Sequence, residues 1–398
     1  MRSRVSAAVV LTLTTALLAA APAAAGGRSP ELEFRGQAIV PTGTMFEGTT
    51  VGGLSSITYD SRRHVFYAVS DDQGQFQPAR FYTVGLDIRD GRLADGDVRF
   101  TDVTTLLAPN GQPYPPLSLD PEGLALTKNR QLIFTSEGLP NNLIDPFVRR
   151  YALDGSFLNS LPVPQPFLAS ADRMSGVRPN LGFESAGAAR HSRYAFTATE
   201  NALYQDGPPA TIASGSPARI LRYDLRKGRL DRQWVYETDP VAQPPVPATQ
   251  FSVNGVVELL PLDDDSLIAM ERSFSVGAPG TGNSIELYEV SLRRATNVNG
   301  VVELLPLDDD SLIAMERSFS VGAPDTGNTI KLFEVSLRGG VARKSLLLDL
   351  DDLGIPLDNV EGMTFGPRLK HGRRSIVLVS DNNFAAAQFT QFLLFALD

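Results

Sequence analysis

The chain has no cysteine, three histidines and one tryptophan among its 398 residues. Without cysteine it can form no disulfide and no thiolate metal site. The histidines (His64, His191 and His371) show no spacing typical of metal ligands, which disfavours zinc chemistry. Basic residues are also few, 36 Lys and Arg against 45 Asp and Glu, and they form no basic run. Nucleic acid, whose phosphates require clustered Lys and Arg, is therefore disfavoured as a partner.

Long apolar runs are missing except near the N-terminus. There, two arginines precede an apolar stretch from Val5 to Leu18, and Ala23-Ala-Ala25 follows. A basic start, an apolar segment and an Ala-x-Ala site are typical of a cleaved export signal. We therefore expect residues 1–25 to be a signal peptide, residues 26–398 to form the mature domain, and the protein to be secreted or periplasmic. No other segment is apolar enough to span a bilayer, so we expect no membrane contact after cleavage.

A helical period is missing as well. Short runs of Val, Ile, Leu, Phe, Tyr and Thr are broken by Gly, Pro, Asp and Asn, which indicates strands and turns. The runs group in fours, for example Leu54 to Tyr59, Val65 to Ser70, Phe81 to Ile88 and Val98 to Val103. Repeated four-strand units of about 40 to 60 residues predict an all-β fold, a β-propeller. An eight-stranded barrel and a pair of β-sandwiches are the alternatives.

One unit is duplicated in tandem. Residues 253–293 recur as residues 298–338, and the copies differ only at Gly280/Asp325, Ser284/Thr329, Glu286/Lys331 and Tyr288/Phe333. The short link between the copies leaves no room for an outer strand. We therefore expect a three-stranded blade beside a four-stranded one, completed by Lys344 to Asp349. This predicts six blades, or five if one copy is not accommodated, in which case we expect the second copy to stay in the ring.

The two ends of the mature chain can complete one blade together. The last unit contains only three runs, Val360 to Phe365, Ser375 to Val379 and Phe389 to Ala396. The missing fourth strand is expected at Leu32 to Val40. Pairing the two ends of the chain closes a propeller ring and removes its sheet edges.

A recurrent pattern of acids accompanies these runs: an acid opens one strand and a second acid closes the next. Antiparallel pairing places both acids at the same end of the sheet. In a propeller they would surround the channel mouth, where oxygen ligands without His or Cys suit calcium, or magnesium less well. For any single acid, a turn cap or an ion pair with arginine is the alternative. The predicted metal ligands are Glu122 with Glu137, Glu184 with Glu200, Glu258 with Glu271, Glu303 with Glu316, and Glu361 with Asp381.

Four motifs are distinctive: Asp120-Pro-Glu-Gly-Leu, Glu271-Arg-Ser-Phe, Asp358-Asn-Val-Glu-Gly-Met-Thr-Phe-Gly366 and Val379-Ser-Asp-Asn-Asn-Phe384. With them, the chain from about Gly52 to Leu397 resembles the exported bacterial phytase-like family, which is described by an esterase-like activity. The resemblance implies a β-propeller and a hydrolase of esters or phosphoesters. The Asp-Asp-Pro-Ala-x-Trp segment of calcium-dependent propeller phytases is absent, so inositol hexakisphosphate is not implied as the substrate.

Together these observations predict an exported, monomeric hydrolase of small-molecule esters or phosphoesters, assisted by calcium. We expect Glu122 and Glu361 to be catalytic acid–base groups, and Arg272 or Arg317 to stabilise the developing anion. The first alternative is a non-catalytic binding or scaffold propeller in which calcium provides only rigidity, since no nucleophile motif is recognisable. A sugar- or lactone-acting propeller enzyme, which would share the acidic mouth, is a further alternative.

Overall fold

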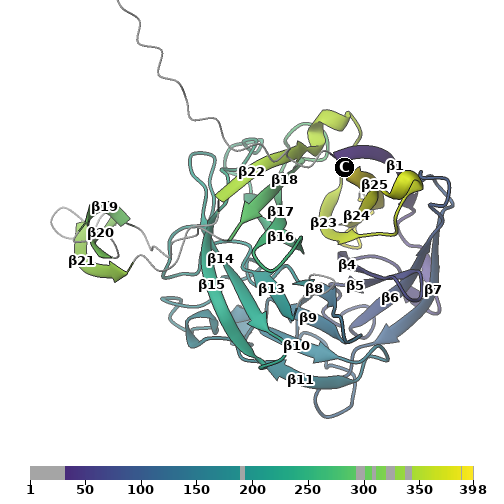
Figure 1. Ribbon diagram of the computed structural model, residues 1–398, viewed down its shortest axis with the longest axis horizontal. Coiled ribbons are helices and arrows are strands. Elements are labelled where there is room, and N and C mark those ends of the chain that lie inside the picture. Colours follow the sequence, from purple (N-terminus) through teal and green to yellow (C-terminus); the bar gives the residue numbers. More distant parts are fainter. Residues whose placement is uncertain are drawn as a thin grey trace, which may run out of the picture.

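The computed structural model describes residues 32–188, 193–292, 301–306, 311–319, 328–336, 343–386 and 388–397, and within residues 301–347 it describes the backbone alone. The expected signal peptide, residues 1–25, lies outside the described residues. Five four-stranded antiparallel sheets form the blades of a β-propeller around one channel (Figure 1). The predicted all-β propeller is confirmed, with five blades rather than the six that we favoured.

Blades 1 to 3 follow one another along the chain. In each blade the strands run outward from the channel in sequence order, which is the arrangement expected for four consecutive hairpin-connected strands. Blade 1 consists of β4 (Leu54–Asp60), β5 (Val65–Ser70), β6 (Arg80–Leu86) and β7 (Val98–Thr105). Blade 2 consists of β8 (Pro121–Leu126), β9 (Leu132–Ser136), β10 (Phe147–Tyr151) and β11 (Phe157–Leu161). Blade 3 consists of β12 (Gly187–Ala188), β13 (Tyr194–Ala198), β14 (Pro217–Asp224) and β15 (Arg229–Glu237).

Blade 4 takes its strands from both sides of the duplication. The first copy supplies β16 (Ser252–Pro261), β17 (Ser266–Ser275) and β18 (Asn283–Ser291), and the outer strand is β22 (Arg343–Asp349). The second copy forms a separate three-stranded sheet of β19 (Val301–Pro306), β20 (Ser311–Phe319) and β21 (Asn328–Ser336), which Figure 1 shows outside the ring. Our expectation that the second copy would stay in the ring is wrong. The second copy loops out as a whole, so β22 can still return to pair with β18 and complete the first copy.

Blade 5 closes the ring as predicted. It consists of β23 (Asn359–Phe365), β24 (Arg374–Asp381), β25 (Thr390–Leu397) and, on its outer edge, β1 (Leu32–Val40). β1 and β25 pair antiparallel from Leu32 opposite Leu397 to Val40 opposite Thr390, with one irregularity near Gly36. A small hairpin of β2 (Met45–Phe46) and β3 (Thr49–Thr50) follows β1.

Aspartates at the strand ends fix the tight turns between strands. After β4, Asp60 Oδ1 accepts hydrogen bonds from the backbone N–H groups of Arg62 and Arg63, at 3.0 and 3.4 Å. After β14, Asp224 Oδ1 does the same for Arg226 and Lys227, at 3.0 and 3.1 Å. Such Asx turns replace backbone pairing where the chain reverses, which explains why Asp follows the apolar runs here.

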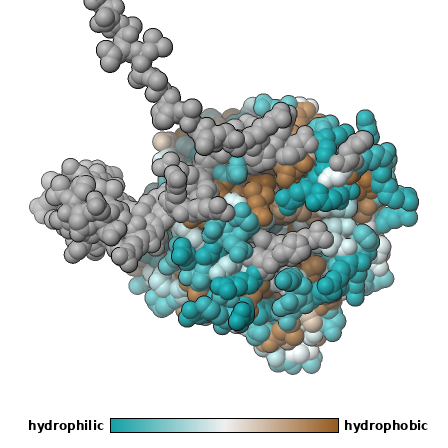
Figure 2. Space-filling model, viewed as in Figure 1, coloured by the Kyte–Doolittle hydropathy of each residue, from teal (hydrophilic) through white to brown (hydrophobic). Residues whose placement is uncertain are grey.

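The hydrophobic core is divided into layers between neighbouring blades. Ile57 and Phe66 of blade 1, for example, pack with Val377 and Phe392 of blade 5, and each further pair of adjacent blades has a similar buried cluster. Because apolar residues fill both faces of the inner strands, these strands read as nearly continuous apolar runs. On the face drawn in Figure 2, hydrophilic residues cover most of the outer edge of the ring. Among the described residues no helix is long and apolar enough to cross a membrane.

Candidate metal centre at the channel mouth

A β-bulge interrupts the first strand of each blade at one end of the channel. In blade 5, Glu361 is the extra residue between two paired positions. The same irregularity lies around Glu122 in blade 2 and, judged by the spacing of the pairs, around Glu184 in blade 3. Ser55 and Val257 take this place in blades 1 and 4. Because a bulge re-aims the side chain of its extra residue, three blades direct a carboxylate out of the regular strand alternation at this end of the channel.

The second strand of each blade contributes one more side chain at the same end, just past the pairing that precedes the bulge. This side chain belongs to Asp71, Glu137, Glu200 and Asp381 in blades 1, 2, 3 and 5, and to Arg272 in blade 4. Four acids and one guanidinium therefore lie beside the bulge residues.

Eight carboxylates gather in this way, and we call them the channel-mouth acids. Most are buried, and Glu122, Glu184 and Glu361 keep 8, 6 and 7 % of their surface exposed. Asp71, which follows β5, is more exposed than any of these three bulge residues. The channel-mouth acids are Asp71, Asp120, Glu122, Glu137, Glu184, Glu200, Glu361 and Asp381.

Two groups of these acids are close enough to share a cation. In one group, Asp120, Glu122 and Glu137 each offer an oxygen within 4.8 Å of the others. In the second group, Glu137, Glu184 and Glu200 do the same. Oxygens bound at about 2.3–2.6 Å to one calcium ion lie at most about 5 Å apart, so both groups have suitable dimensions.

Burial and mutual repulsion raise the pKa of these acids. Burial raises the pKa of Asp120 and that of Asp381 to about 6, and it raises the pKa of Glu361 to about 8. Burial, followed by the charges of Asp120 and Asp71, raises the pKa of Glu122 well above its usual range. Without a cation, part of this group therefore holds protons at neutral pH.

Arg272 is the cation that contacts the channel-mouth acids in the described part of the chain. Its Nη1 donates to Glu361 Oε1 at 2.6 Å and also to Asn359 Oδ1, and its Nη2 donates to Glu200 Oε1 at 3.2 Å. Burial opposes the charge on the guanidinium, yet Glu361 and Glu200 raise the pKa of Arg272 above its ordinary value. Asn359 extends the network, because its Nδ2 donates to Asp381 Oδ2 at 3.1 Å. Arg272 thus neutralises the half of the mouth near blades 3 to 5.

Blade 4 departs from the predicted pattern of paired acids. Glu258 lies one residue past the bulge, opposite Met270, and it is fully buried below the mouth. Glu271 accepts hydrogen bonds from the Tyr236 hydroxyl and from the backbone of Asp239. The structure therefore does not bring Glu258 and Glu271 into the group. The reason is register: strand side chains alternate with a period of two, so an offset of one residue changes where each acid points.

The acids of the second copy are placed only through their strands. Glu303 lies in β19 opposite Met315, as Glu258 lies opposite Met270, and Glu316 and Arg317 lie in β20. Their side chains are outside the described residues. Since β19–β21 pair with no described strand of the ring, the first copy supplies the side chains of blade 4 at the mouth.

Asp71, Asp120 and Asn359 belong to the site but were not among the predicted metal ligands. Asp120 precedes the bulge acid Glu122 by two residues, and Asn359 precedes Glu361 by the same distance. This shared spacing is the signal that could have identified Asn359, because it places both polar side chains just before a bulge.

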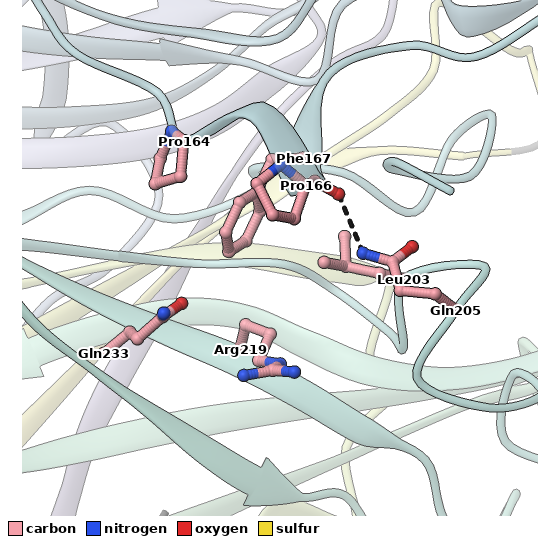
Figure 3. A pocket seen from close by; sticks show the side chains of 7 residues that line it. All are labelled: Pro164, Pro166, Phe167, Leu203, Gln205, Arg219 and Gln233. Carbon is pink, nitrogen blue, oxygen red and sulfur yellow. Dashed lines mark hydrogen bonds between the residues drawn. The ribbon is translucent and has the colours of Figure 1, made fainter. Parts of the chain in front are cut away.

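Two cavities lie away from the channel-mouth acids. Figure 3 shows one of about 290 Å³, between blades 2 and 3, with Gln205 donating to the carbonyl of Pro166 at 2.8 Å. The Arg219 guanidinium at its wall is held by two hydrogen bonds to Asp206, at 2.7 and 2.8 Å. A second cavity, of about 490 Å³, is lined by residues of blade 1 and by Pro367 and Arg368. Neither is lined by a channel-mouth acid.

Comparison with known proteins gives one family match. A family model described as "Phytase-like: Esterase-like activity of phytase" matches residues 49–301 and 296–384. No curated protein matches the chain.

Among solved structures, a Bacteroides vulgatus protein of the DUF4221 family is 11 % identical with a TM-score of 0.35, covering 93 % of this chain and 98 % of its own. An α-L-arabinofuranosidase from Fusarium graminearum, solved with an iminosugar inhibitor, is 7 % identical with a TM-score of 0.40, covering 91 % and 97 %. A Bacteroides caccae protein of unknown function is 12 % identical with a TM-score of 0.25, covering 67 % and 89 %.

Proposed function

The chain belongs to the phytase-like family, and on that premise we propose that it is an exported hydrolase of small-molecule esters or phosphoesters that uses a calcium ion at the channel mouth. The observation that carries this proposal is the gathering of eight carboxylates at the channel mouth, where Arg272 is the one cation that contacts them in the described part of the chain. So many acids at one point would repel one another strongly unless protons or a cation compensate them.

The residues present fit a calcium ion. The ligand groups are all carboxylate oxygens, which calcium prefers, and no sulfur or imidazole ligand is among them. One buried oxygen, Asp71 Oδ1, has no hydrogen-bond partner. Asp120, Glu122 and Glu137 would hold the ion, since this is the group that Arg272 does not contact, whereas Arg272 pairs with Glu200 and Glu361.

When bound, calcium would polarise the ester oxygen and lower the pKa of a bound water. Glu361 is the candidate proton acceptor, because it is the bulge residue of blade 5 at the mouth and burial raises its pKa to about 8. Asn359 Nδ2 and Arg272 Nη1 both donate to Glu361 Oε1, at 2.9 and 2.6 Å, and so fix its orientation. Glu122, the second acid that we expected to be catalytic, would serve here as a ligand of the ion, and a carboxylate bound to calcium holds no proton to donate.

Arg272 would stabilise the negative charge that develops on the substrate. Its guanidinium lies at the mouth, and the ion pairs with Glu361 and Glu200 raise its pKa and so keep it protonated. A fixed cation of this kind needs little reorganisation during reaction, which is the source of its catalytic advantage. Arg317, its counterpart in the second copy, is not needed in this arrangement.

The test is hydrolysis of an aryl acetate and an aryl phosphate by the mature protein. We expect chelator to abolish turnover and added calcium to restore it. Glu361→Gln should reduce kcat about 100-fold or more, as for the loss of an acid–base group. Glu122→Gln should instead raise the calcium concentration needed for turnover, as for the loss of a ligand. Glu47→Gln is the matched control, because Glu47 is exposed and lies far along the chain from the bulge acids. Turnover that is indifferent to chelation would refute the calcium mechanism.

One observation favours a second candidate function, a calcium-stabilised propeller without catalysis. The acids are almost completely buried, and Arg272 is already engaged by three partners. In that case, calcium would raise the unfolding temperature while no ester or phosphoester in the panel is turned over.

A further inference from the structure

Glu258 is a buried carboxylate that the proposed chemistry does not use. Its Oε2 accepts a hydrogen bond of 2.6 Å from Ser56 Oγ of blade 1, and its Oε1 accepts one of 2.9 Å from the N–H of Leu259. The backbone amides of Ala186 in blade 3 and Met363 in blade 5 also face this carboxylate. Strands from four different blades meet at one side chain, which is possible only at the centre of the channel.

We propose that Glu258 is a positioning residue that ties the first strands of blades 1, 3, 4 and 5 together directly beneath the channel-mouth acids. We call these hydrogen bonds to Glu258 the tie. Every group that faces the carboxylate is a donor, namely the Ser56 hydroxyl and the backbone amides, so the two oxygens of Glu258 are the acceptors in all of these hydrogen bonds. A side chain without two acceptor oxygens cannot satisfy these donors at once, and a buried donor left unsatisfied weakens the structure.

The other blades leave room for this side chain. One step past the bulge, the positions that correspond to Glu258 are occupied by Ser56, Gly123, Ser185 and Gly362. A Cβ on Gly123 would lie 2.4 Å from the backbone nitrogen of Ala186, and a Cβ on Gly362 would lie 2.9 Å from the Cα of Ser56. The first strands therefore approach each other almost backbone to backbone, and Glu258 is the one long side chain among these five positions.

The hydrogen bonds to Glu258 lie close in sequence to two of the channel-mouth acids. Ala186 and Met363, whose amides face Glu258, follow the bulge acids Glu184 and Glu361 by two residues. The first strands belong to different sheets, so no backbone ladder holds one against another. Repulsion among the channel-mouth acids pushes these strands apart, and Glu258 opposes that separation close to where the acids emerge. Metal sites depend on such support, and losing it commonly lowers metal affinity about 10- to 100-fold.

The experiment compares Glu258→Gln with Glu303→Gln in the otherwise unchanged chain. Glu303 has the same neighbours in sequence, Val-Val-Glu-Leu-Leu-Pro, but its strand pairs with no described strand of the ring. Calcium binding is measured by titration calorimetry far below the unfolding transition, so that both variants are folded. We expect E258Q to weaken calcium binding about tenfold or more, and E303Q to bind like the unchanged chain. At saturating calcium, kcat of E258Q should recover, because the residue does not touch the substrate.

A second variant covers the case in which E258Q does not fold. Ser56→Ala removes one donor to the carboxylate and leaves Glu258 in place, and we expect a smaller loss of calcium affinity in the same direction. Unchanged calcium affinity in both variants, or equal losses in E258Q and E303Q, would overturn the proposal. The calcium readout rests on the proposed function. If the unchanged chain binds no calcium, that function fails, and the tie is then judged by the urea midpoint, which E258Q should lower and E303Q should not.

Discussion

Replacing Arg272 by alanine should destabilise the protein in a way that depends on pH. The guanidinium contacts Glu361 at 2.6 Å and Glu200 at 3.2 Å, and all three side chains are largely buried. Removing one member of a buried ion pair costs about 3–5 kcal/mol, because the remaining charge loses its compensation. Here two carboxylates are left, so we expect a loss of about 3–5 kcal/mol in the free energy of unfolding at pH 8 without calcium.

The orphaned carboxylates can reduce this cost by binding protons. The loss caused by Arg272→Ala should therefore shrink as the pH is lowered to 5. Arg272→Lys should recover only part of the stability, since one ammonium cannot reproduce the forked contacts with both acids. Urea denaturation in chelator, followed by fluorescence at pH 5 and pH 8, provides the measurement.

Arg317→Ala is the matched control, because Arg317 stands in the same Glu-Arg-Ser-Phe sequence of the second copy. We expect this change to alter stability by less than about 0.5 kcal/mol. Equal effects of the two substitutions, or a stable Arg272→Ala protein at pH 8, would show that Arg272 does not compensate the channel-mouth acids.

Three further predictions concern the ring and its acids. In chelator, the free energy of unfolding should fall as the pH rises from about 4 to 8. The reason is that Asp120, Asp381 and Glu361 have raised pKa values in the folded state, about 6, 6 and 8, and so hold protons that the unfolded chain releases. Saturating calcium should remove this trend, and a free energy of unfolding that rises with pH in chelator would contradict it. Deleting residues 294–338 should leave the five-bladed ring intact and stabilise it by up to about 2 kcal/mol, since the connection from β18 to β22 becomes about eightfold shorter. Loss of folding, seen by circular dichroism, would mean that the second copy is needed. Gly123→Ala should lower the free energy of unfolding by about 1–3 kcal/mol, because its Cβ would lie 2.4 Å from Ala186 N. Gly85→Ala is the control and should leave the melting temperature unchanged, because the nearest neighbour of its Cβ would be 3.8 Å away.

The sequence was sufficient to predict the ring because its signals are local. Apolar runs and turn residues such as Asp60 and Asp224 specify each hairpin independently of the rest of the chain. Closure by β1 and β25 could also be predicted, because the last unit lacked a strand and the first segment had none to pair with.

The behaviour of the duplication could not be predicted from local signals. The two copies are nearly identical, so they form the same three strands and differ only in which one the ring accommodates. Which copy lies in the ring depends on whether the outer strand β22 pairs with the third strand of the first copy or of the second, and β22 pairs with β18 of the first copy. Distance along the chain suggested the second copy, but a connection that loops out costs little free energy.

Register limited the prediction of the site. Glu122, Glu184 and Glu361 occupy the bulge, whereas Glu258 stands one residue later and Arg272 takes the place of an acid. A bulge is defined by cross-strand hydrogen bonds, and an acid-to-acid spacing that varies from blade to blade does not reveal it. The polar residue two positions before the bulge acid, Asp120 or Asn359, is the better marker.

The most direct test of a calcium site at the channel mouth is a crystal structure of the mature protein grown with calcium, with anomalous diffraction recorded at long wavelength. We expect an anomalous peak among the carboxylates of Asp120, Glu122 and Glu137, with oxygens about 2.3–2.6 Å away. Arg272 should remain on Glu200 and Glu361. An ordered channel mouth without a peak at saturating calcium would show that these acids do not hold a cation.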